Sequence, residues 1–361
     1  MLEEAKVQSR SKFRTKQIVA VFALVVVNAL WGLSFPIMKS LNLQMEHCFG
    51  VESIKVSNSL QIAFTAGMIG IRFSIAILFL CLFCPRLVRN TSQAEWFAGI
   101  CVGLFFYFGL VLQVMGLATI PASRSGFLTS LTAVFTPILS AVFFRKLPSW
   151  NVALGVCIAL LGVSILTGLI VCDGLKFGVA SDAIGKWTIG DTLTTLGSVL
   201  FTGQLMLVDY YGKRLNSAAI TSGMFLAVMI ASGLTFLALH QVSLPQRLLD
   251  NESVWQIWSK LFFSPPFLGL VVFLAMFCSV LAFLGMNKYQ PHITAVQASV
   301  IYSCEPVFAS SWALFLPCWL GLFATNYGYP NEILSLPLFV GGTLILLANI
   351  VALWPRRDGV G

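Results

Sequence analysis

The feature that most limits the fold of this chain is a set of ten apolar runs, each about as long as a membrane-crossing helix. A hydrocarbon layer about 30 Å thick needs roughly 20 apolar residues in a helix. The runs lie at 17–40, 63–84, 94–118, 122–144, 149–172, 190–211, 217–239, 266–287, 292–317 and 333–354. None shows the alternation over about ten residues that marks a strand of a membrane β-barrel. The sequence therefore predicts an all-α polytopic membrane protein with ten transmembrane helices.

The composition excludes most other classes of protein. Hydrophobic residues make up 58% of the 361 residues and charged residues 10%, whereas a soluble domain is about 25% charged. The net charge of +8 comes from short basic clusters between the apolar runs, without a long basic tract. We therefore expect the lipid bilayer as a partner and no nucleic acid. The nine cysteines form no CxxC pair with a matching His or Cys pair, which predicts buried free thiols and no metal site.

The distribution of Lys and Arg predicts the orientation in the membrane. With a cytoplasmic N-terminus, fourteen basic residues lie in inner segments and six in outer segments. The inner set is Lys6, Arg10, Lys12, Arg14, Lys16, Arg86, Arg89, Arg145, Lys146, Lys213, Arg214, Lys288, Arg356 and Arg357. Because Lys and Arg are enriched on the cytoplasmic side, both termini are predicted to be cytoplasmic, in a bacterial-type plasma (inner) membrane.

An offset of 169 residues aligns the chain with itself. The aligned pairs are Pro137 with Pro306, Leu147-Pro148 with Leu316-Pro317, Gly116 with Gly285, Ser130 with Ser299, and Phe108 with Phe277. Each half then holds five spans, and an odd number forces the two halves into opposite orientations. Inverted repeats are frequent in transporters, with the substrate site near the midplane between the halves. A gene duplication without transport is the alternative.

Four segments of the chain resemble motifs of one transporter family. They are NALWGLSFPIMKS, which begins at Asn28; IRFSIAILFL, which contains Arg72; PASRSGFLTSLTAVFTPILSAVFF, which begins at Pro121; and YSCEPVFAS, which contains Glu305 and Pro306. In this order and spacing the chain resembles the EamA-type transporters of the drug/metabolite transporter (DMT) superfamily. The resemblance implies the DMT transporter fold and alternating access around a central cavity lined by helices 1, 3, 4, 6, 8 and 9.

The chain departs from the family pattern at two places. Thr136 stands where the second half has Glu305, and Arg145-Lys146 stands where members often have a Gly-Glu pair. The predicted organisation is a cytoplasmic tail at 1–16, a first EamA-like repeat at 17–172, an outer connecting loop at 173–189, a second repeat at 190–354 and a cytoplasmic tail at 355–361. The loops at about 41–62, 240–265 and 318–332 are long. They either cap the outer mouth or are insertions that the fold tolerates.

Glu305 and Arg72 are ionisable groups deep in the ninth and second apolar runs. Such a group costs about 2.5–3.5 kcal/mol inside a membrane, so it needs a partner or a function. One interpretation is a structural Arg72–Glu305 ion pair, or separate hydrogen bonds to carbonyls that proline leaves free. The other makes Glu305 a proton- or substrate-responsive group and Arg72 an anion site.

A polar and aromatic stripe runs along the first predicted helix. Asn28, Trp31, Phe35 and Lys39 share one helical face. Asn28 has no partner in lipid, so this face is predicted to line the interior or a cavity. Trp31 is assigned to the cavity wall, although core packing would also explain it. Lys39 is expected to extend its amine to the outer interface, and Pro36 permits a kink in this helix.

Further polar residues and prolines complete the predicted site. Gln113, Gln204 and Tyr302 are candidates for hydrogen bonds in the cavity, although each could instead bridge two helices. Pro137 and Pro306 are expected to kink the fourth and ninth helices and to free backbone carbonyls. Gly99 and Gly103 form a GxxxG motif that indicates close helix packing within the chain.

The motifs that the chain lacks narrow its function. It contains no HExxH, GxSxG or GxxxxGK[ST] motif, so neither a metalloprotease, an esterase nor an ATP-driven pump is indicated. We expect no cofactor, no enzymatic activity and no obligate protein partner. The prediction is a secondary transporter of a small-molecule substrate, an exporter of amino acid-like or drug-like solutes with protons as a candidate coupling ion. A membrane enzyme acting on lipid-linked substrates and a non-transporting scaffold or sensor are the alternatives.

Overall fold

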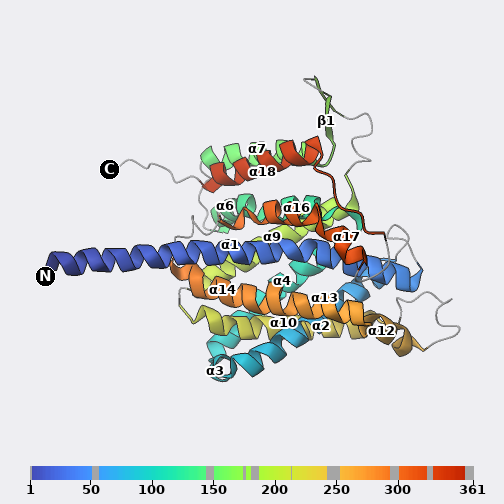
Figure 1. The fold of residues 1–361 in the computed structure, drawn as a ribbon, viewed down its shortest axis with the longest axis horizontal. Helices are drawn as coiled ribbons and strands as arrows, with labels where there is room; N and C mark the ends of the chain where they lie inside the picture. Colours follow the sequence, from blue (N-terminus) through green and yellow to red (C-terminus); the bar gives the residue numbers. More distant parts are fainter. Residues whose placement is uncertain are drawn as a thin grey trace.

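The structure is a computed structural model of the chain, and it is a bundle of helices that run roughly side by side (Figure 1). It describes residues 2–50, 57–143, 150–173, 176–179, 187–212, 214–241, 253–292, 301–322 and 328–353. Several predictions fall outside these residues: the tail at 355–361, most of the connecting loop at 173–189, the basic residues Arg145, Lys146 and Lys213, the Leu147-Pro148 pair, and Ser299.

The first half of the chain supplies seven of the described helices. These are α1 (Leu2–Phe49), α2 (Asn58–Phe83), α3 (Pro85–Arg89), α4 (Gln93–Thr119), α5 (Ala122–Thr129), α6 (Thr132–Phe143) and α7 (Trp150–Leu166). α4 shows why a helix begins where it does. The Ser92 hydroxyl accepts from the backbone N–H of Glu95, and the Glu95 carboxylate accepts from the N–H of Ser92. This reciprocal capping satisfies two backbone donors that a helix start leaves free.

The second half of the chain supplies more helices, several of them short. Its helices are α9 (Ile189–Gly212), α10 (Ser217–Leu239), α12 (Val254–Phe262), α13 (Pro265–Phe273), the π-helix η2 (Leu274–Leu281), α14 (Ala282–Tyr289), the short 3-10 helix η3 (Gln290–His292), α16 (Glu305–Ala313), α17 (Leu316–Leu320) and α18 (Leu336–Leu353). α13, η2 and α14 follow one another without a break, so they make a single span with a widened turn in its middle.

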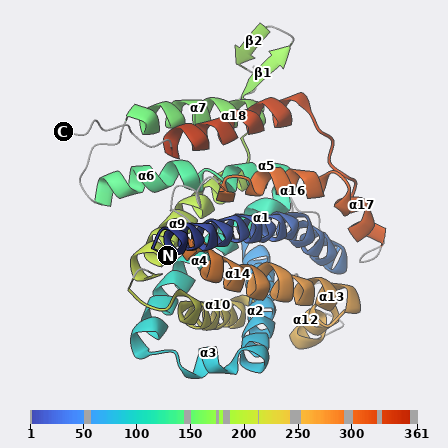
Figure 2. The ribbon, with the colours of Figure 1, turned by 60° about the vertical axis from the view of Figure 1, so that its left-hand side comes forward.

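A small β-hairpin qualifies the all-α prediction. Strands β1 (Ile170–Asp173) and β2 (Lys176–Val179) pair antiparallel, with Ile170 opposite Val179. The hairpin stands away from the bundle in both views (Figures 1 and 2). The fifth apolar run was predicted to continue to residue 172, but α7 ends at Leu166. The Ile170-Val171 pair that follows favours a strand, because β-branched side chains suit an extended backbone.

Five helices of the described part are long and apolar enough to cross a membrane: Lys16–Phe49, Asn58–Phe83, Gln93–Thr119, Ser217–Leu239 and Pro265–Tyr289. They match the first, second, third, seventh and eighth predicted spans. The fourth run is divided between α5 and α6, and the ninth run is described only from residue 301. The long loop at 240–265 contains α12, which folds back so that the Trp258 indole donates to the carbonyl of His240 at 3.0 Å.

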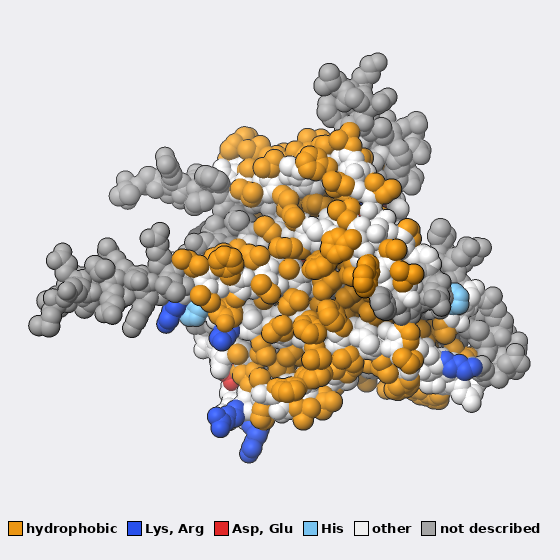
Figure 3. Space-filling view, viewed as in Figure 1, with side chains coloured by type: hydrophobic (Ala, Val, Ile, Leu, Met, Phe, Trp, Pro, Cys, Tyr) orange, Lys and Arg blue, Asp and Glu red, His pale blue; other side chains and the backbone are white. Residues whose placement is uncertain are grey.

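Hydrophobic side chains cover the outside of the bundle as well as its core. Figure 3 shows them spread over the face in view, with the visible basic side chains toward the two ends of the long axis. Phe22, Leu82, Phe97 and Leu160 are among the exposed large side chains. A large exposed apolar surface is rare on soluble proteins and suits contact with lipid tails. The eight cysteines whose side chains the structure describes are free, and Cys278 alone among them is buried. The prediction of buried thiols is wrong for the others, because apolar runs also face outward.

Glycines let the helices of the core approach closely. Gly99 and Gly103 pack against α10, where a β-carbon on Gly99 would lie 2.6 Å from the Cα of Gly223. α4 also packs against α9, and α7 packs against α18. Where α7 crosses α18, a β-carbon on Gly162 would lie 2.9 Å from the carbonyl oxygen of Gly341. The GxxxG motif therefore serves packing within the chain, as the sequence predicted.

The fourth and ninth spans are interrupted where they border the interior (Figure 2). A turn at Ser130 and Leu131 separates α5 from α6, and a turn at Ser303 and Cys304 precedes α16. The prolines do not sit in these turns. Pro137 lies inside α6, and Pro306 lies in the first turn of α16, where a missing N–H costs nothing. Pro36 does not interrupt α1, which is one helix from Leu2 to Phe49.

Candidate functional site

A cavity inside the bundle is lined by residues from both halves of the chain. Its volume is about 150 Å³, which is the size of an apolar cavity that holds benzene. The structure brings six of the residues predicted from the sequence to its wall: Trp31, Arg72, Gln113, Gln204, Tyr302 and Glu305. They come from α1, α2, α4 and α9 and from the start of α16. The turn between α5 and α6 also borders the cavity through Ser130 and Thr132.

Aromatic rings form much of the cavity wall. The Trp31 ring lies 5.6 Å from the Phe283 ring and 5.7 Å from the Tyr302 ring, measured between centroids. Phe106 lies 5.8 Å from Phe201 and 5.4 Å from Phe283. Such tilted and edge-on pairs are favourable beyond the area they bury. The rings therefore give the cavity a rigid apolar wall that does not collapse.

Arg72 is held by the widened turn of η2. Its Nε donates to the Ser279 hydroxyl at 2.9 Å and its Nη2 to the Cys278 carbonyl at 3.4 Å. A π-helix leaves carbonyls without their usual partners, and such turns are frequent at functional sites. Among the described residues, no ion pair joins Arg72 to Glu305. The carbonyl that Arg72 reaches belongs to the π-helix, whereas the sequence suggested a carbonyl that a proline leaves free.

Glu305 begins α16 and faces the cavity. Within the described part of the chain, its carboxylate makes no hydrogen bond or ion pair. The partial positive charge of a helix N-terminus stabilises a carboxylate in the first turn. That interaction does not occupy the lone pairs of the oxygens, which remain open to the cavity.

The other polar side chains in the cavity wall differ in the hydrogen bonds they make to the protein. The Gln113 amide donates to the Thr129 hydroxyl at 2.9 Å, so this side chain links α4 to α5. Tyr302 donates its hydroxyl to the Gln290 amide oxygen at 2.8 Å. Gln204 is 5% exposed, and its amide has no partner among the described residues.

Two residues of the predicted stripe on α1 do not line the cavity. The buried Asn28 amide donates to the backbone carbonyl of Ile301, so Asn28 bridges α1 to the segment before α16. Lys39 was expected to reach the outer interface. Instead its Nζ donates to the Ala118 carbonyl at 2.6 Å, in the last turn of α4. The carbonyls at a helix end lack partners, and a buried ammonium satisfies one of them.

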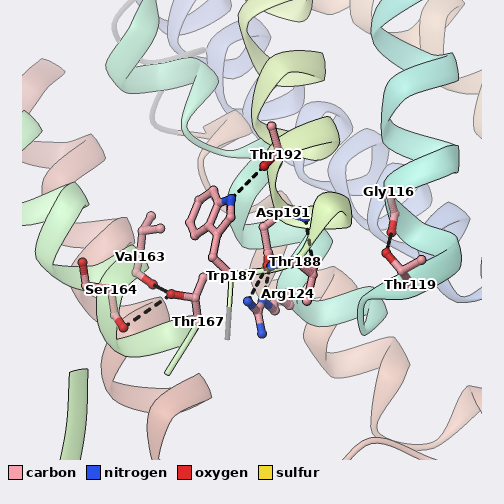
Figure 4. A network of polar contacts seen from close by, with 10 residues as sticks. All are labelled: Gly116, Thr119, Arg124, Val163, Ser164, Thr167, Trp187, Thr188, Asp191 and Thr192. Atoms are coloured by element: carbon pink, nitrogen blue, oxygen red, sulfur yellow. Dashed lines mark hydrogen bonds and ion pairs between the residues drawn. The ribbon is translucent and has the colours of Figure 1, made fainter. Parts of the chain in front are cut away.

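An ion pair joins the two halves near the start of α5 and α9 (Figure 4). Arg124 donates from Nε and Nη2 to the two oxygens of Asp191, both at 2.6 Å. The same carboxylate accepts from the backbone N–H and the hydroxyl of Thr188 at 2.8 and 2.9 Å. Asp191 is fully buried, and 17% of the Arg124 side chain is exposed. A carboxylate with this many donors is fixed in place.

Glu332 makes a second contact between the halves at this end of the bundle. Its Oε1 accepts from the N–H of Ala122 at 2.6 Å, and its Oε2 accepts from the hydroxyl of Ser123 and from its N–H at 3.3 Å. The backbone N–H of Glu332 also donates to the Ala313 carbonyl at 2.9 Å. The segment before α18 is therefore fastened to the start of α5 and to the end of α16.

Sequence reasoning missed several of these residues. Glu332 was not singled out, although it is one of only 14 acids in the chain and directly precedes the tenth predicted span. The rings of Phe106, Phe201 and Phe283 gave no signal, because 30 phenylalanines are distributed through the apolar runs. Within the described ranges, no three His, Cys, Asp or Glu side chains come together as metal ligands would.

Comparison with known proteins shows which proteins this chain is similar to. Residues 18–168 match the model of the EamA-like transporter family. An uncharacterized transporter of Archaeoglobus fulgidus is 24% identical over 336 residues, which cover 93% of this chain and 86% of the relative. A crystal structure of another protein superposes with a TM-score of 0.50 at 19% identity, covering 93% of this chain and 96% of the other. At that identity the likeness concerns the fold alone.

Proposed function

Because residues 18–168 match the model of the EamA-like transporter family, a branch of the DMT superfamily, we propose that this multi-pass membrane protein belongs to that family and is a secondary active carrier of small organic metabolites. It exports amino acid-like or drug-like solutes by alternating access. The observation that carries the proposal is the cavity: both halves of the chain build its wall, and Glu305 faces it without a partner among the described residues.

The contacts between helices support ten spans in two inverted repeats. In such a repeat α1 corresponds to α9, α2 to α10, α4 to the span α13–η2–α14, α5 and α6 to α16, and α7 to α18. The main contacts of one half then have counterparts in the other half. The contact of α4 with α9 corresponds to that of α14 with α1. The contact of α10 with α4 corresponds to that of η2 with α2. The contact of α16 with α1 corresponds to that of α6 with α9. These matched contacts support repeats at 17–172 and 190–354.

Aligned residues of the two halves play equivalent parts. A β-carbon on Gly116 of α4 would lie 2.4 Å from the Thr194 hydroxyl of α9. A β-carbon on Gly285, its partner at the offset of 169, would lie 3.1 Å from Val27 of α1. Both glycines therefore face the first helix of the opposite repeat at close range. This equivalence supports the repeat more strongly than the identity of two glycines in an apolar sequence does.

The conformation suggests which side of the transporter is closed. The ion pair of Arg124 with Asp191 and the bonds of Glu332 to the start of α5 lie at one end of the bundle. The exposed basic residues Lys16, Arg86, Arg89, Arg214 and Lys288 lie at helix ends toward the other side. By the positive-inside rule that other side is cytoplasmic, in a bacterial inner membrane. The polar network then closes the outer side, and the solute enters from the cytoplasm.

The test compares the growth medium of bacterial cells that express the protein, its Glu305→Gln variant, or neither. A solute enriched only by the intact protein is the expected result, because export needs the carboxylate in the cavity. Asp209→Asn is the matched control, since it removes a carboxylate of α9 outside the cavity wall and should leave enrichment unchanged.

The outcomes separate transport from the role of Glu305. Equal enrichment by Glu305→Gln would keep the exporter and remove this residue from the mechanism. No enrichment by the intact protein, together with no uptake of labelled metabolites, would contradict the proposal. In proteoliposomes that transport the solute, the flux through Glu305→Gln should no longer depend on pH, whereas the flux through Asp209→Asn should.

A further inference from the structure

Hydroxyl groups of the cavity wall donate their hydrogens within the protein. A hydroxyl carries a single hydrogen. Ser34 donates it to the Trp31 carbonyl at 2.6 Å, Thr132 to the Thr129 carbonyl at 2.6 Å, and Thr136 to the Thr132 carbonyl at 2.7 Å. Ser130 likewise donates to the Phe127 carbonyl at 2.8 Å. The oxygens of these groups can still accept a hydrogen bond, but they have no hydrogen left to donate.

The guanidinium of Arg72 is similarly committed. Besides its bonds to Ser279 and Cys278, its Nη1 lies 3.8 Å from the sulfur of Met38. Each of its three nitrogens thus contacts the protein. These contacts use three of its five N–H donors and fasten α2 to η2.

The open groups include three acceptors, beside the unused amide hydrogens of Gln204 and Gln113. Glu305 offers a carboxylate without a partner in the described part of the chain. The buried amide of Gln204, 5% exposed, lines the same cavity and has no partner among the described residues. Gln113 has spent an amide hydrogen on Thr129, and its oxygen is unused by the described bonds. A solute that donates several hydrogen bonds and carries a positive charge would satisfy the carboxylate and the two amide oxygens.

The size and the walls of the cavity describe the rest of the solute. About 150 Å³ accommodates a body of roughly the size of benzene. The rings of Trp31, Phe106 and Phe283 surround it, and ring faces attract cations as well as apolar groups. An apolar body with a small charged head fits these walls.

Building on the proposed function, we propose that the solute is a primary amine whose ammonium is attached to a small aromatic or apolar body. The ammonium donates to the carboxylate of Glu305 and to the amide oxygen of Gln204, and the body packs on Trp31. Charge-assisted hydrogen bonds of this kind are roughly twice as strong as neutral ones.

Calorimetry on the purified full-length protein at neutral pH tests this class. The probes are phenethylamine, its neutral counterpart 2-phenylethanol, the anion 3-phenylpropionate and the zwitterion phenylalanine. We expect phenethylamine to bind at least about tenfold more tightly than each of the others, because it alone combines a positive charge with no carboxylate. Glu305→Gln and Gln204→Leu should each weaken its binding, and Asp209→Asn should not.

Three results would overturn the amine assignment. Tighter binding of 3-phenylpropionate, abolished by Arg72→Gln, would make Arg72 an anion site. Preference for phenylalanine over phenethylamine would require a carboxylate on the solute. Equal binding of phenethylamine and 2-phenylethanol would remove the role of charge. Calorimetry measures binding without transport, so these results are independent of the export test. If the protein exports a solute but binds no amine, the amine class is wrong and the proposed transport function is kept. A variant that binds nothing must retain the unfolding temperature of the intact protein.

Discussion

Asp191 and Glu332 differ from Glu305 in how completely the protein satisfies their carboxylates. Asp191 accepts from Arg124 and Thr188, and Glu332 accepts from Ala122 and Ser123. Glu305 has no such donor in the part of the chain that the structure describes. A carboxylate saturated by the protein holds two segments together. A carboxylate without donors weakens the fold and is explained best by a ligand that supplies them.

The free-energy cost of an unpaired carboxylate inside a membrane protein makes this difference informative. An acid inside a membrane protein costs at least about 2.5 kcal/mol unless it is paired or reaches water. Glu305 lines a cavity, so water or a solute can reach it. The two kinds of carboxylate therefore predict opposite results when each is neutralised: stability should fall for the saturated acids, and solute binding should fall for Glu305.

The largest expected loss of stability follows Asp191→Asn. The amide can still accept from Thr188, but it removes the charge that Asp191 pairs with the guanidinium of Arg124. Breaking a buried pair from one side costs about 3 kcal/mol. Thermal unfolding in detergent should show a clear fall in Tm. A Tm within error of the intact protein would mean that Asp191 is no more structural than Glu305.

A smaller loss is expected for Glu332→Gln. The amide oxygen can keep one bond to the start of α5, but the charge that strengthens these bonds is lost. Hydrogen bonds to a charged group contribute about 1.5 kcal/mol or more. Tm should fall by less than for Asp191→Asn. Because this contact closes one end of the bundle, the solute flux measured in proteoliposomes should change as well. Unchanged flux would show that this contact is only structural.

The smallest expected effect concerns solute binding in the cavity that Glu305 faces. Trp31→Ala removes a ring that packs on Phe283 and Tyr302 in the cavity wall. One aromatic contact is worth about 0.5–1.5 kcal/mol, so the half-saturating solute concentration should rise several-fold while Tm changes little. Loss of expression without a change in that concentration would make Trp31 a packing residue.

Much of the cavity wall could be predicted from the sequence, because polar residues are rare in its apolar runs. Arg72, Gln113, Gln204 and Glu305 are conspicuous there, and the structure places all four at one cavity. The same argument placed Asn28 in the cavity, but its amide bonds to Ile301 instead. Periodicity shows which face of a helix is turned inward. It does not show whether a cavity or another helix lies opposite that face.

The interruptions of the spans were predicted less well, because the prolines were taken as their cause. The turns fall at Ser130-Leu131 and Ser303-Cys304, while α1 continues through Pro36. Hydroxyls and the contacts of neighbouring helices can satisfy the carbonyls that a proline frees, so a proline alone does not locate a break.

The sequence by itself determined that this chain is a polytopic membrane protein with polar groups in its interior, since hydrophobic length and rare polar residues are local properties of the chain. Only the tertiary structure decided which of those groups are satisfied. Asp191 and Arg124 lie 67 residues apart, and Glu332 lies 209 residues from Ser123. A hydrogen bond requires two atoms within about 3 Å of each other. That proximity comes from how the two halves pack, so the open carboxylate of Glu305 could be recognised only in the folded chain.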